Sequence, residues 1–279
     1  MTFRIYGSDH SPWVQAVLLG AHERRIDYSL ITSPPWPVFL RWGVLMPAAS
    51  VNDDSWQVES SDILERMGYA RISEVDRAAV YGAWHGVLHR PDSILRFFHR
   101  FSLAGDPSAS SLIRLRNNFL RSFATLYFCL LIRFAVLRSG YNDAENFGDQ
   151  FLYFEENLAN RTTQFLGGET PDMTDLMLFG IIQCHSSIPV PPTAALQGDS
   201  RLVRLREWIA AMHLRFSDYP HLYSGKDYAP HLPTPKRASM LDQVAFWLGS
   251  AANVAGFIVT VPLIVFLFLR VRRARGRRA

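Results

Sequence analysis

Cysteine and lysine are the residues that this chain has least of. Only two of its 279 residues are cysteines, Cys129 and Cys184, and both lie in apolar runs without the spacing of a paired or metal-binding motif. This pattern predicts reduced core residues in a reducing compartment and excludes a disulfide scaffold. It also predicts no metal site. Lysine occurs twice against 27 arginines, a bias for which the sequence offers no structural reason.

The body of the chain lacks an excess of positive charge, although the whole chain carries +4. Six arginines lie in the last ten residues with no acid among them, and residues 1–269 carry 23 basic against 25 acidic side chains, a net −2. The body is therefore not expected to bind nucleic acid. The first residues show no apolar secretory signal. At 48% apolar residues, the chain has enough material for a sizeable core.

Strand patterns are missing after about residue 77. Before that point, the patterns alternate as β-α-β-(α)-β-β-α, which predicts one small α/β domain over residues 1–70. The later patterns predict an all-α helical-bundle domain over residues 77–218, with helices near 77–101, 110–138, 144–165, 172–186 and 199–216. Proline, histidine and tyrosine are frequent after Tyr219, and we expect a linker over residues 219–243.

Ser11 and Pro12 follow the first expected strand and open a helical pattern. Proline suits the first turn of a helix, and a serine before it can cap the free N–H groups. One interpretation is a helix cap and nothing more. The other is an anion site, because the N-terminus of a helix carries positive potential.

Two further short motifs follow in the same region. Met46-Pro47 places a proline in strand context, where it is normally excluded unless the chain is kinked or cis. Glu59-Ser60 opens a helix, and Ser60 could cap that helix or hold a carboxylate. Each motif alone has a plain structural explanation.

Taken in order, these motifs make the chain resemble the glutathione transferases over about residues 3–215. "YGSDHSPWVQAVLLGAHERRIDYSLI" is similar to the first βαβ unit of that family, and "LMPAASVNDDSWQVESSDILERMG" to its cis-proline and Glu-Ser elements. Asp172 lies three residues before Asp175 at the start of an apolar helix, which predicts an N-terminal capping box. The resemblance implies a thioredoxin-like domain, an all-α domain and glutathione as co-substrate.

The resemblance also implies roles for individual residues. Ser11 would donate a hydrogen bond to the sulfur of glutathione, the backbone of Met46 beside a cis Pro47 would pair with its cysteinyl unit, and Glu59 and Ser60 would bind its γ-glutamyl end. Tyr6 is a weaker alternative for the thiol. His10 is interpreted as an exposed neighbour that could add positive charge. The loop at residues 33–43 matches no peptide-binding signature of the family.

Charge is absent from residues 243–269. The densest apolar part, residues 251–269, would span about 28 Å as a helix, close to the hydrocarbon core of a bilayer. We expect one C-terminal transmembrane helix over residues 244–270, kinked at Pro262, and a basic tail over 271–279. The arginines favour a tail on the cytoplasmic side, which would put the body on the opposite side of a helix that crosses the membrane. The body is nevertheless expected to be cytosolic, because a glutathione site needs a reducing compartment. A helix that enters the membrane without crossing would satisfy both constraints.

These expectations combine into a tail-anchored, glutathione transferase-like protein that conjugates glutathione to hydrophobic electrophiles at a membrane. Its lipid contact would be residues 251–269, and a homodimer is left open. The alternative is a non-catalytic protein similar to the metaxins, acting in membrane assembly or transport. A carrier of lipophilic ligands is a third hypothesis.

Overall fold

The chain folds into two compact units. A computed structural model describes residues 2–52, 54–85, 93–104, 106, 108–139, 146–187, 191–223 and 238–276. Unit 1 comprises Met1–Val87 and Ala144–Pro235, and unit 2 comprises Leu88–Asp143 and Lys236–Ala279. The expected α/β domain and most of the expected helical domain therefore lie together in unit 1.

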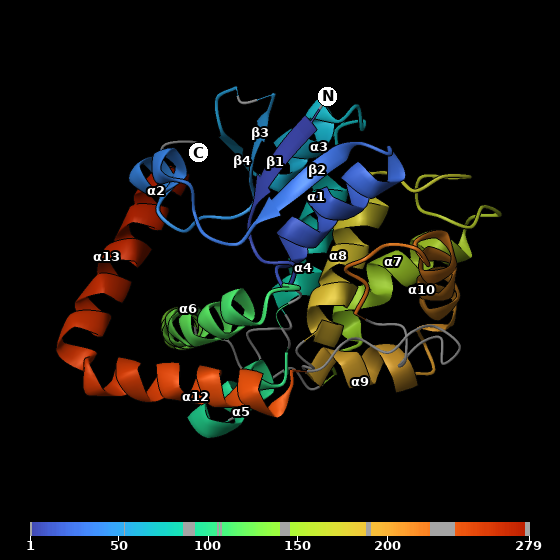
Figure 1. The fold of residues 1–279 in the computed structure, drawn as a ribbon. Helices are drawn as coiled ribbons and strands as arrows, with labels where there is room; N and C mark the ends of the chain where they lie inside the picture. The colour runs from blue at the N-terminus through green and yellow to red at the C-terminus, as the bar shows by residue number, and fades with distance from the viewer. Residues whose placement is uncertain are drawn as a thin grey trace. The chain divides into compact units, whose positions relative to one another are not determined.

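A four-stranded mixed sheet forms the N-terminal part of unit 1 (Figure 1). Its order is β2 (Asp27–Ile31), β1 (Thr2–Tyr6), β3 (Ala48–Val51) and β4 (Gln57–Val58). β1 runs parallel to β2 and antiparallel to β3, and β3 is antiparallel to β4. With α1 (Pro12–Glu23), α2 (Trp36–Trp42) and α3 (Ser60–Arg66), the element order is the one expected from the sequence.

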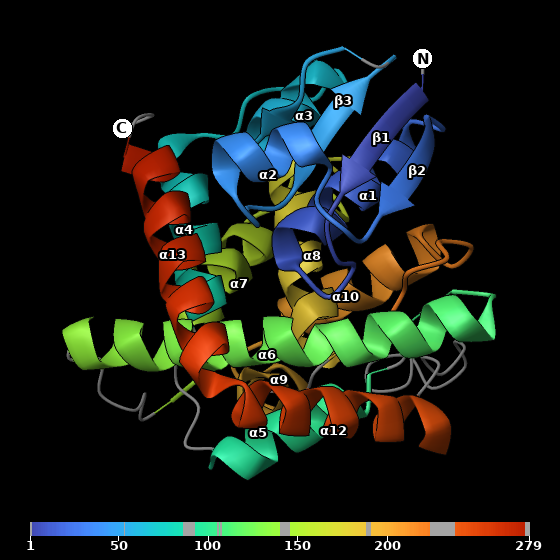
Figure 2. The same cartoon turned by 60° about the vertical axis from the view of Figure 1, so that its left-hand side comes forward.

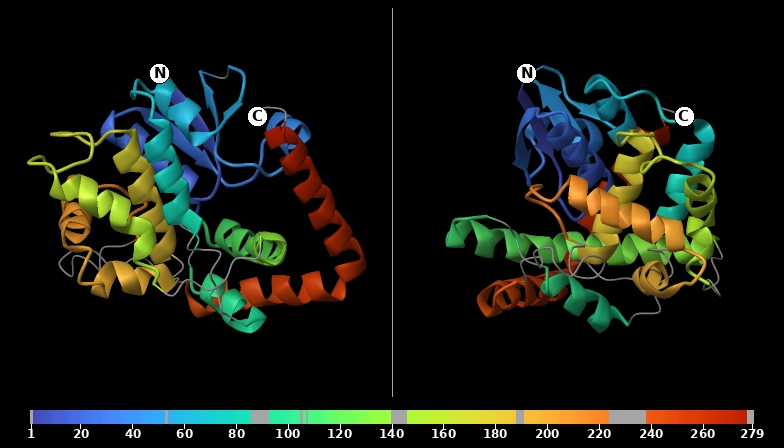
Figure 3. Two further views of the ribbon diagram at one scale, coloured as in Figure 1. Left: turned by 180° about the vertical axis from the view of Figure 1, so that it is seen from behind. Right: turned by 90° about the vertical axis from the view of Figure 1, so that its right-hand side faces the viewer.

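The core of unit 1 forms between this sheet and its helices. Along β1, Phe3 and Ile5 are fully buried while Arg4 between them is exposed, as the two-residue period of a strand requires. α1 packs against α3 and along the nearly wholly buried α8 (Met173–Ser187), drawn as blue and yellow ribbons in Figure 3. The small sheet is thus joined to a mostly helical body.

The helical part of unit 1 contains α4 (Glu74–His85), a short 3-10 turn (Asp149–Phe151), α7 (Leu152–Ala159), α8, α9 (Pro191–Gly198) and α10 (Val203–Arg215). α9 was not expected from the sequence. Within the described residues, the helix expected near 77–101 consists of α4 in unit 1 and α5 (Ile94–Ser102) in unit 2.

The predicted capping box at the start of α8 is confirmed. The N–H of Asp175 donates to Asp172 Oδ1, and the N–H of Asp172 donates to Asp175 Oδ2, both at 3.0 Å. Asp175 is fully buried and also accepts hydrogen bonds from the Leu166 N–H at 2.9 Å and the Trp208 indole at 2.7 Å. Burial, with a smaller contribution from Asp172, raises the pKa of Asp175 to about 7, against the opposing effect of these donors.

Unit 2 is helical in its described residues and contains α5, α6 (Ser111–Ser139), α12 (Met240–Ala255) and α13 (Phe257–Gly276). Cys129 of α6 is buried, and neither it nor Cys184 of α8 forms a disulfide. Figure 2 shows α12 and α13 meeting at a sharp bend. Gly256 is the one residue between the two helices.

This bend corrects the expectation of one continuous helix over residues 244–270. The apolar run 251–269 is divided at Gly256 between α12 and α13, and Pro262 lies inside α13. In the part of the chain that the structure describes, no single helix combines the length and apolarity needed to cross a membrane. α12 and residues 257–273 of α13 meet those criteria only as a pair, bent by 96°.

The expected linker over residues 219–243 also differs in part. Tyr219 is buried in the core of unit 1, and α12 begins at Met240. Residues 224–237 lie outside the described residues, so the linker there stays a prediction.

Candidate functional site

The register of the sheet brings the three sequence motifs to one edge. Tyr6 at the end of β1 pairs with Ala48 at the start of β3, and Ala48 pairs with Val58 at the end of β4. Ser11-Pro12, Met46-Pro47 and Glu59-Ser60 therefore all lie beyond the same end of the sheet. The N-termini of α1 and α3 lie there as well, because each helix follows its strand by a few residues.

Gly7 shows how closely two of these segments approach. A Cβ atom at Gly7 would lie 2.3 Å from Val14 Cγ2 and 3.4 Å from Met46 Cβ. Only glycine fits in this space, so the loop that leads to Ser11 passes directly against Met46. The Met46-Pro47 peptide bond is cis, as predicted, and Pro47 is buried.

Ser11 occupies the N-cap position of α1, but its hydroxyl does not form the capping hydrogen bond that the sequence led us to expect. Its carbonyl accepts the first helical bond from the Gln15 N–H at 2.9 Å. Pro12 at the first helical position has no N–H to satisfy. The half-buried hydroxyl of Ser11 therefore stands at a helix N-terminus without serving as its cap.

The first turn of α1 packs directly against the backbone of α8. A Cβ atom at Gly180 would lie 2.4 Å from the Pro12 carbonyl oxygen and 3.0 Å from the Ala16 nitrogen. Glycine at this position lets the backbones of the two helices touch. The position of Ser11 thus depends on a close helix crossing in the core.

Glu59, and not Ser60, is the N-cap residue of α3, which corrects the expected cap by one position. Glu59 has φ 86° and ψ 123°, in the region that a side chain with a Cβ atom rarely adopts. Such a conformation costs on the order of 1–3 kcal/mol and is concentrated at functional sites. Ser60 is buried at the first position of α3.

A buried polar cluster beside Ser11 was not found from the sequence. Asp9 is 5% exposed, and its Oδ2 atom accepts a hydrogen bond from the Tyr223 hydroxyl at 2.8 Å and lies 3.1 Å from His221 Nδ1. Gln15 donates to the carbonyls of Asp9 at 2.6 Å and His221 at 3.0 Å, and it accepts from the Tyr219 hydroxyl at 2.8 Å. The segment after α10, residues 219–223, is therefore hydrogen-bonded to the loop that carries Ser11 and to the first turn of α1.

The charge of Asp9 is stabilised by its neighbours. Burial alone would raise the pKa of Asp9, but the hydrogen bond from His221, the charges of His10 and His221, and the hydrogen bond from Tyr223 lower it to about 2. The ring of His10 stacks on that of Tyr223 with centroids 5.0 Å apart, so His10 belongs to this cluster and is not the exposed neighbour expected from the sequence. Tyr6 is buried in β1.

The loop at residues 33–43, for which the sequence leaves an irregular segment or a brief helix open, contains α2. Its Trp36 is exposed and stacks on Phe39. Among the described residues, no group of three or more His, Cys, Asp and Glu side chains is placed to hold a metal ion.

Comparisons with known proteins give structural matches only. No family model matches the chain, and no curated protein matches it in sequence. A glutathione S-transferase from Xanthobacter autotrophicus is similar in structure, with a TM-score of 0.41 and 16% identity over 76% of this chain and 92% of that one.

A Bombyx mori glutathione transferase has a TM-score of 0.44 and 14% identity over 90% of this chain and 97% of its own. A theta class glutathione S-transferase from Xanthomonas axonopodis pv. citri, solved with glutathione bound, has a TM-score of 0.41 and 16% identity over 81% and 97%. These matches concern the fold alone and do not bear on the residues of the site.

Proposed function

We propose that the protein is a glutathione transferase-like enzyme that binds glutathione at the edge of the sheet where the three motifs meet. The observation that carries the proposal is the register from Tyr6 through Ala48 to Val58, which puts Ser11, Met46 and Ser60 at one end of three adjacent strands. The backbone of Met46 would pair with the cysteinyl unit, and Glu59 and Ser60 would hold the γ-glutamyl end.

Ser11 would act on the sulfur. A free thiol has a pKa of about 8.5 and is mostly protonated at pH 7. A hydroxyl donor and a helix N-terminus both favour the thiolate, and the Ser11 hydroxyl is not used as a cap. The thiol proton would leave to solvent, and the sulfur would form a bond to the electrophilic carbon of a hydrophobic substrate as the leaving group departs. No metal is required for this chemistry.

We also propose that the protein acts at a membrane, with a cytosolic body held there by its C-terminal apolar segment. The uncharged residues 243–269 followed by six arginines support this location. A hydrophobic electrophile would then reach the site from the lipid phase. A homodimer is compatible with this arrangement.

Calorimetric titration of the full-length protein in detergent with reduced glutathione tests the proposal. We expect saturable binding at millimolar concentration or below. Ser11→Ala should keep the stability of the fold and lose thiolate stabilisation. Ser93→Ala is the matched control, because the Ser93 hydroxyl caps α5 by accepting from the Arg96 N–H at 3.3 Å; it should cost about 1 kcal/mol of stability and leave glutathione binding unchanged.

If the protein binds no glutathione at millimolar concentration, the enzyme proposal is wrong. The metaxin-like alternative, a non-catalytic component of membrane assembly or transport, would then take its place.

A further inference from the structure

The two units carry opposite net charges. Unit 2 holds 16 basic and 4 acidic side chains, a net +12, whereas unit 1 holds 13 basic and 21 acidic ones, a net −8. The modest charge of the whole chain hides this asymmetry. A unit so strongly positive attracts a negatively charged partner, and a membrane rich in anionic lipid is one such surface.

α13 exposes apolar side chains where a helix of a water-soluble protein would expose polar ones. Ile258 and Val259 are 74% and 71% exposed, and Thr260 is the one polar residue between Phe257 and Leu269. The exposed large apolar residues of α13 are Phe257, Ile258, Val259, Val261, Leu263, Val265, Phe266 and Leu269. Such a continuous apolar surface favours contact with lipid over nucleic acid, which binds basic surfaces without it.

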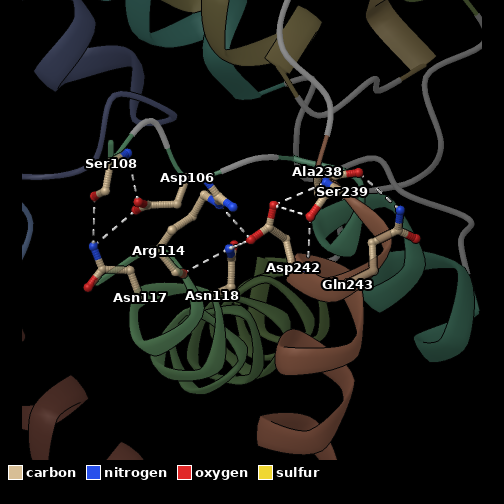
Figure 4. Close-up of polar contacts among 9 residues, drawn as sticks. All are labelled: Asp106, Ser108, Arg114, Asn117, Asn118, Ala238, Ser239, Asp242 and Gln243. Atoms are coloured by element: carbon tan, nitrogen blue, oxygen red, sulfur yellow. Dashed lines mark hydrogen bonds and ion pairs between the residues drawn. The ribbon is translucent and has the colours of Figure 1, made fainter. Parts of the chain in front are cut away.

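α12 is held against α6 at its first turn (Figure 4). Ser239 and Asp242 form a capping box at the start of α12. The buried Asp242 carboxylate also accepts from Arg114 Nε at 2.9 Å and Asn118 Nδ2 at 3.1 Å, both on α6. Burial would raise the pKa of Asp242, but the hydrogen bonds from Ser239 and Arg114, together with the charge of Arg114, lower it below its usual value.

The same contact continues to the last turn of α12. A Cβ atom at Gly249 would lie 2.4 Å from the Phe119 carbonyl oxygen and 2.5 Å from Ser122 Oγ, so the helices touch there. Asn253 Nδ2 donates to Ser122 Oγ at 3.0 Å. α12 is therefore part of the packed body of unit 2 and is not available to extend α13 into one straight helix.

The uncharged stretch that continues beyond α12 is too short to span a bilayer. Residues 257–269 would measure about 20 Å along a helix, against a hydrocarbon core of about 30 Å. Arg270, Arg272 and Arg273 follow at once. Stretches of this length are typical of interfacial or re-entrant segments.

We propose that α13 lies in one leaflet of an anionic bilayer without crossing it, so that Arg272 and Arg273 bind lipid headgroups on the same side as unit 1. The inference rests on the proposed membrane location. It also removes the conflict between a basic tail and a cytosolic body, because both then face the same compartment.

Flotation of the full-length protein with vesicles tests the lipid contact. We expect the protein to float with vesicles of phosphatidylcholine and phosphatidylserine, and more weakly with phosphatidylcholine alone. Ile258→Asp should reduce the partition by about 100-fold. Leu214→Asp is the matched control, because Leu214 is equally exposed, at 70%, on α10 of unit 1; it should float as the parent does.

The arginines are tested with a second pair of variants. Arg272→Gln/Arg273→Gln should weaken binding to the anionic vesicles about 25-fold, or about fivefold for each arginine. Arg71→Gln/Arg204→Gln removes the same charge from exposed positions of unit 1 and should have little effect. Equal effects of the two double variants would contradict a specific role of the tail.

Topology decides between lying in the leaflet and crossing it. Ala279→Cys and Asp218→Cys are each labelled in sealed vesicles with a membrane-impermeant maleimide, and the labelling of the parent chain is subtracted. Ala279→Cys reports the side of the C-terminus, and Asp218→Cys reports the side of unit 1. We expect both positions to react before detergent is added. Reaction of Ala279→Cys only after detergent would show that α13 crosses, which overturns this inference and leaves the membrane location intact.

Absence of flotation with either vesicle would overturn the membrane location itself. Binding of the parent to duplex DNA, lost in Arg272→Gln/Arg273→Gln and without flotation, would assign the basic surface to nucleic acid.

Discussion

Asp9→Asn is the substitution for which the structure gives the clearest magnitude. The carboxylate of Asp9 is almost completely buried and is held by Tyr223 and His221. An amide keeps the shape of the side chain and can still accept from the Tyr223 hydroxyl, but it cannot ionise. The change therefore isolates the contribution of the charge.

The size of that contribution follows from the pKa of Asp9, which is about 2 in the folded protein against 3.8 for the same carboxyl group in the unfolded chain. A difference of that size corresponds to about 2.4 kcal/mol. Because the folded pKa is the lower one, the stabilisation is present above pH 4 and is lost as the pH falls through 2. We expect the difference in the free energy of unfolding between the parent and Asp9→Asn to be about 2 kcal/mol larger at pH 5 than at pH 2. About half of this decrease should have occurred when the pH has fallen to 3.

Urea unfolding followed by tryptophan fluorescence measures this difference, because six of the seven tryptophans lie in unit 1. Asp218→Asn is the matched control: its carboxylate also faces a histidine, His22 at 3.0 Å, but is 81% exposed. It should change stability little at either pH. A difference between parent and Asp9→Asn that is the same at pH 5 and pH 3 would refute the reasoning.

Two further predictions concern helix crossings and the buried ion pair of unit 2. Gly180→Ala should lower the free energy of unfolding by about 1–3 kcal/mol and weaken glutathione binding, because the new methyl group meets the Pro12 carbonyl. Gly82 has open space around it, so Gly82→Ala should instead raise the free energy of unfolding by up to about 1 kcal/mol. If Gly82→Ala and Gly180→Ala changed stability equally in chemical denaturation, the close contact between α1 and α8 would not be the cause. Asp242→Ala should lower the free energy of unfolding of unit 2 by about 3 kcal/mol, because it leaves Arg114 without its ion-pair partner. Hydrogen exchange of unit 2 measures this loss, and unchanged protection of the α12 amides would contradict it.

The features that the sequence predicted depend on residues close together in the chain. The order of strands and helices in residues 1–68, the cis bond before Pro47 and the box between Asp172 and Asp175 are each encoded within a few residues. Local steric preferences and capping chemistry decide such features. The sequence does not show that the motifs at Ser11, Met46 and Glu59 meet at one edge of the sheet. That follows from the register of β1, β3 and β4, which only the structure supplies.

The features that the sequence missed depend on distant residues. Asp9 and Tyr223 are separated by 214 positions, and nothing in the local pattern of either residue indicates that they meet. Tyr219 was placed in a linker because its neighbours are proline and histidine, but its ring is buried in the core.

The break in the C-terminal apolar run is a second case. Pro262 was the expected kink, since proline removes a helical hydrogen bond. The helix instead ends before Gly256, where contacts of Gly249 and Asn253 with α6 fix the direction of α12. Packing against another helix decided the position of the bend.

The ionisation of the thiol of bound glutathione is the most direct test of whether Ser11 stabilises the thiolate. Thiolate absorbance is titrated against pH for glutathione bound to the parent, to Ser11→Ala and to Ser11→Gly. We expect a thiol pKa below 8.5 on the parent. In both variants we expect a higher thiol pKa and a conjugation rate at pH 7 that is about 10–100-fold slower, with little loss of stability. The same thiol pKa in all three proteins would contradict the assignment of Ser11.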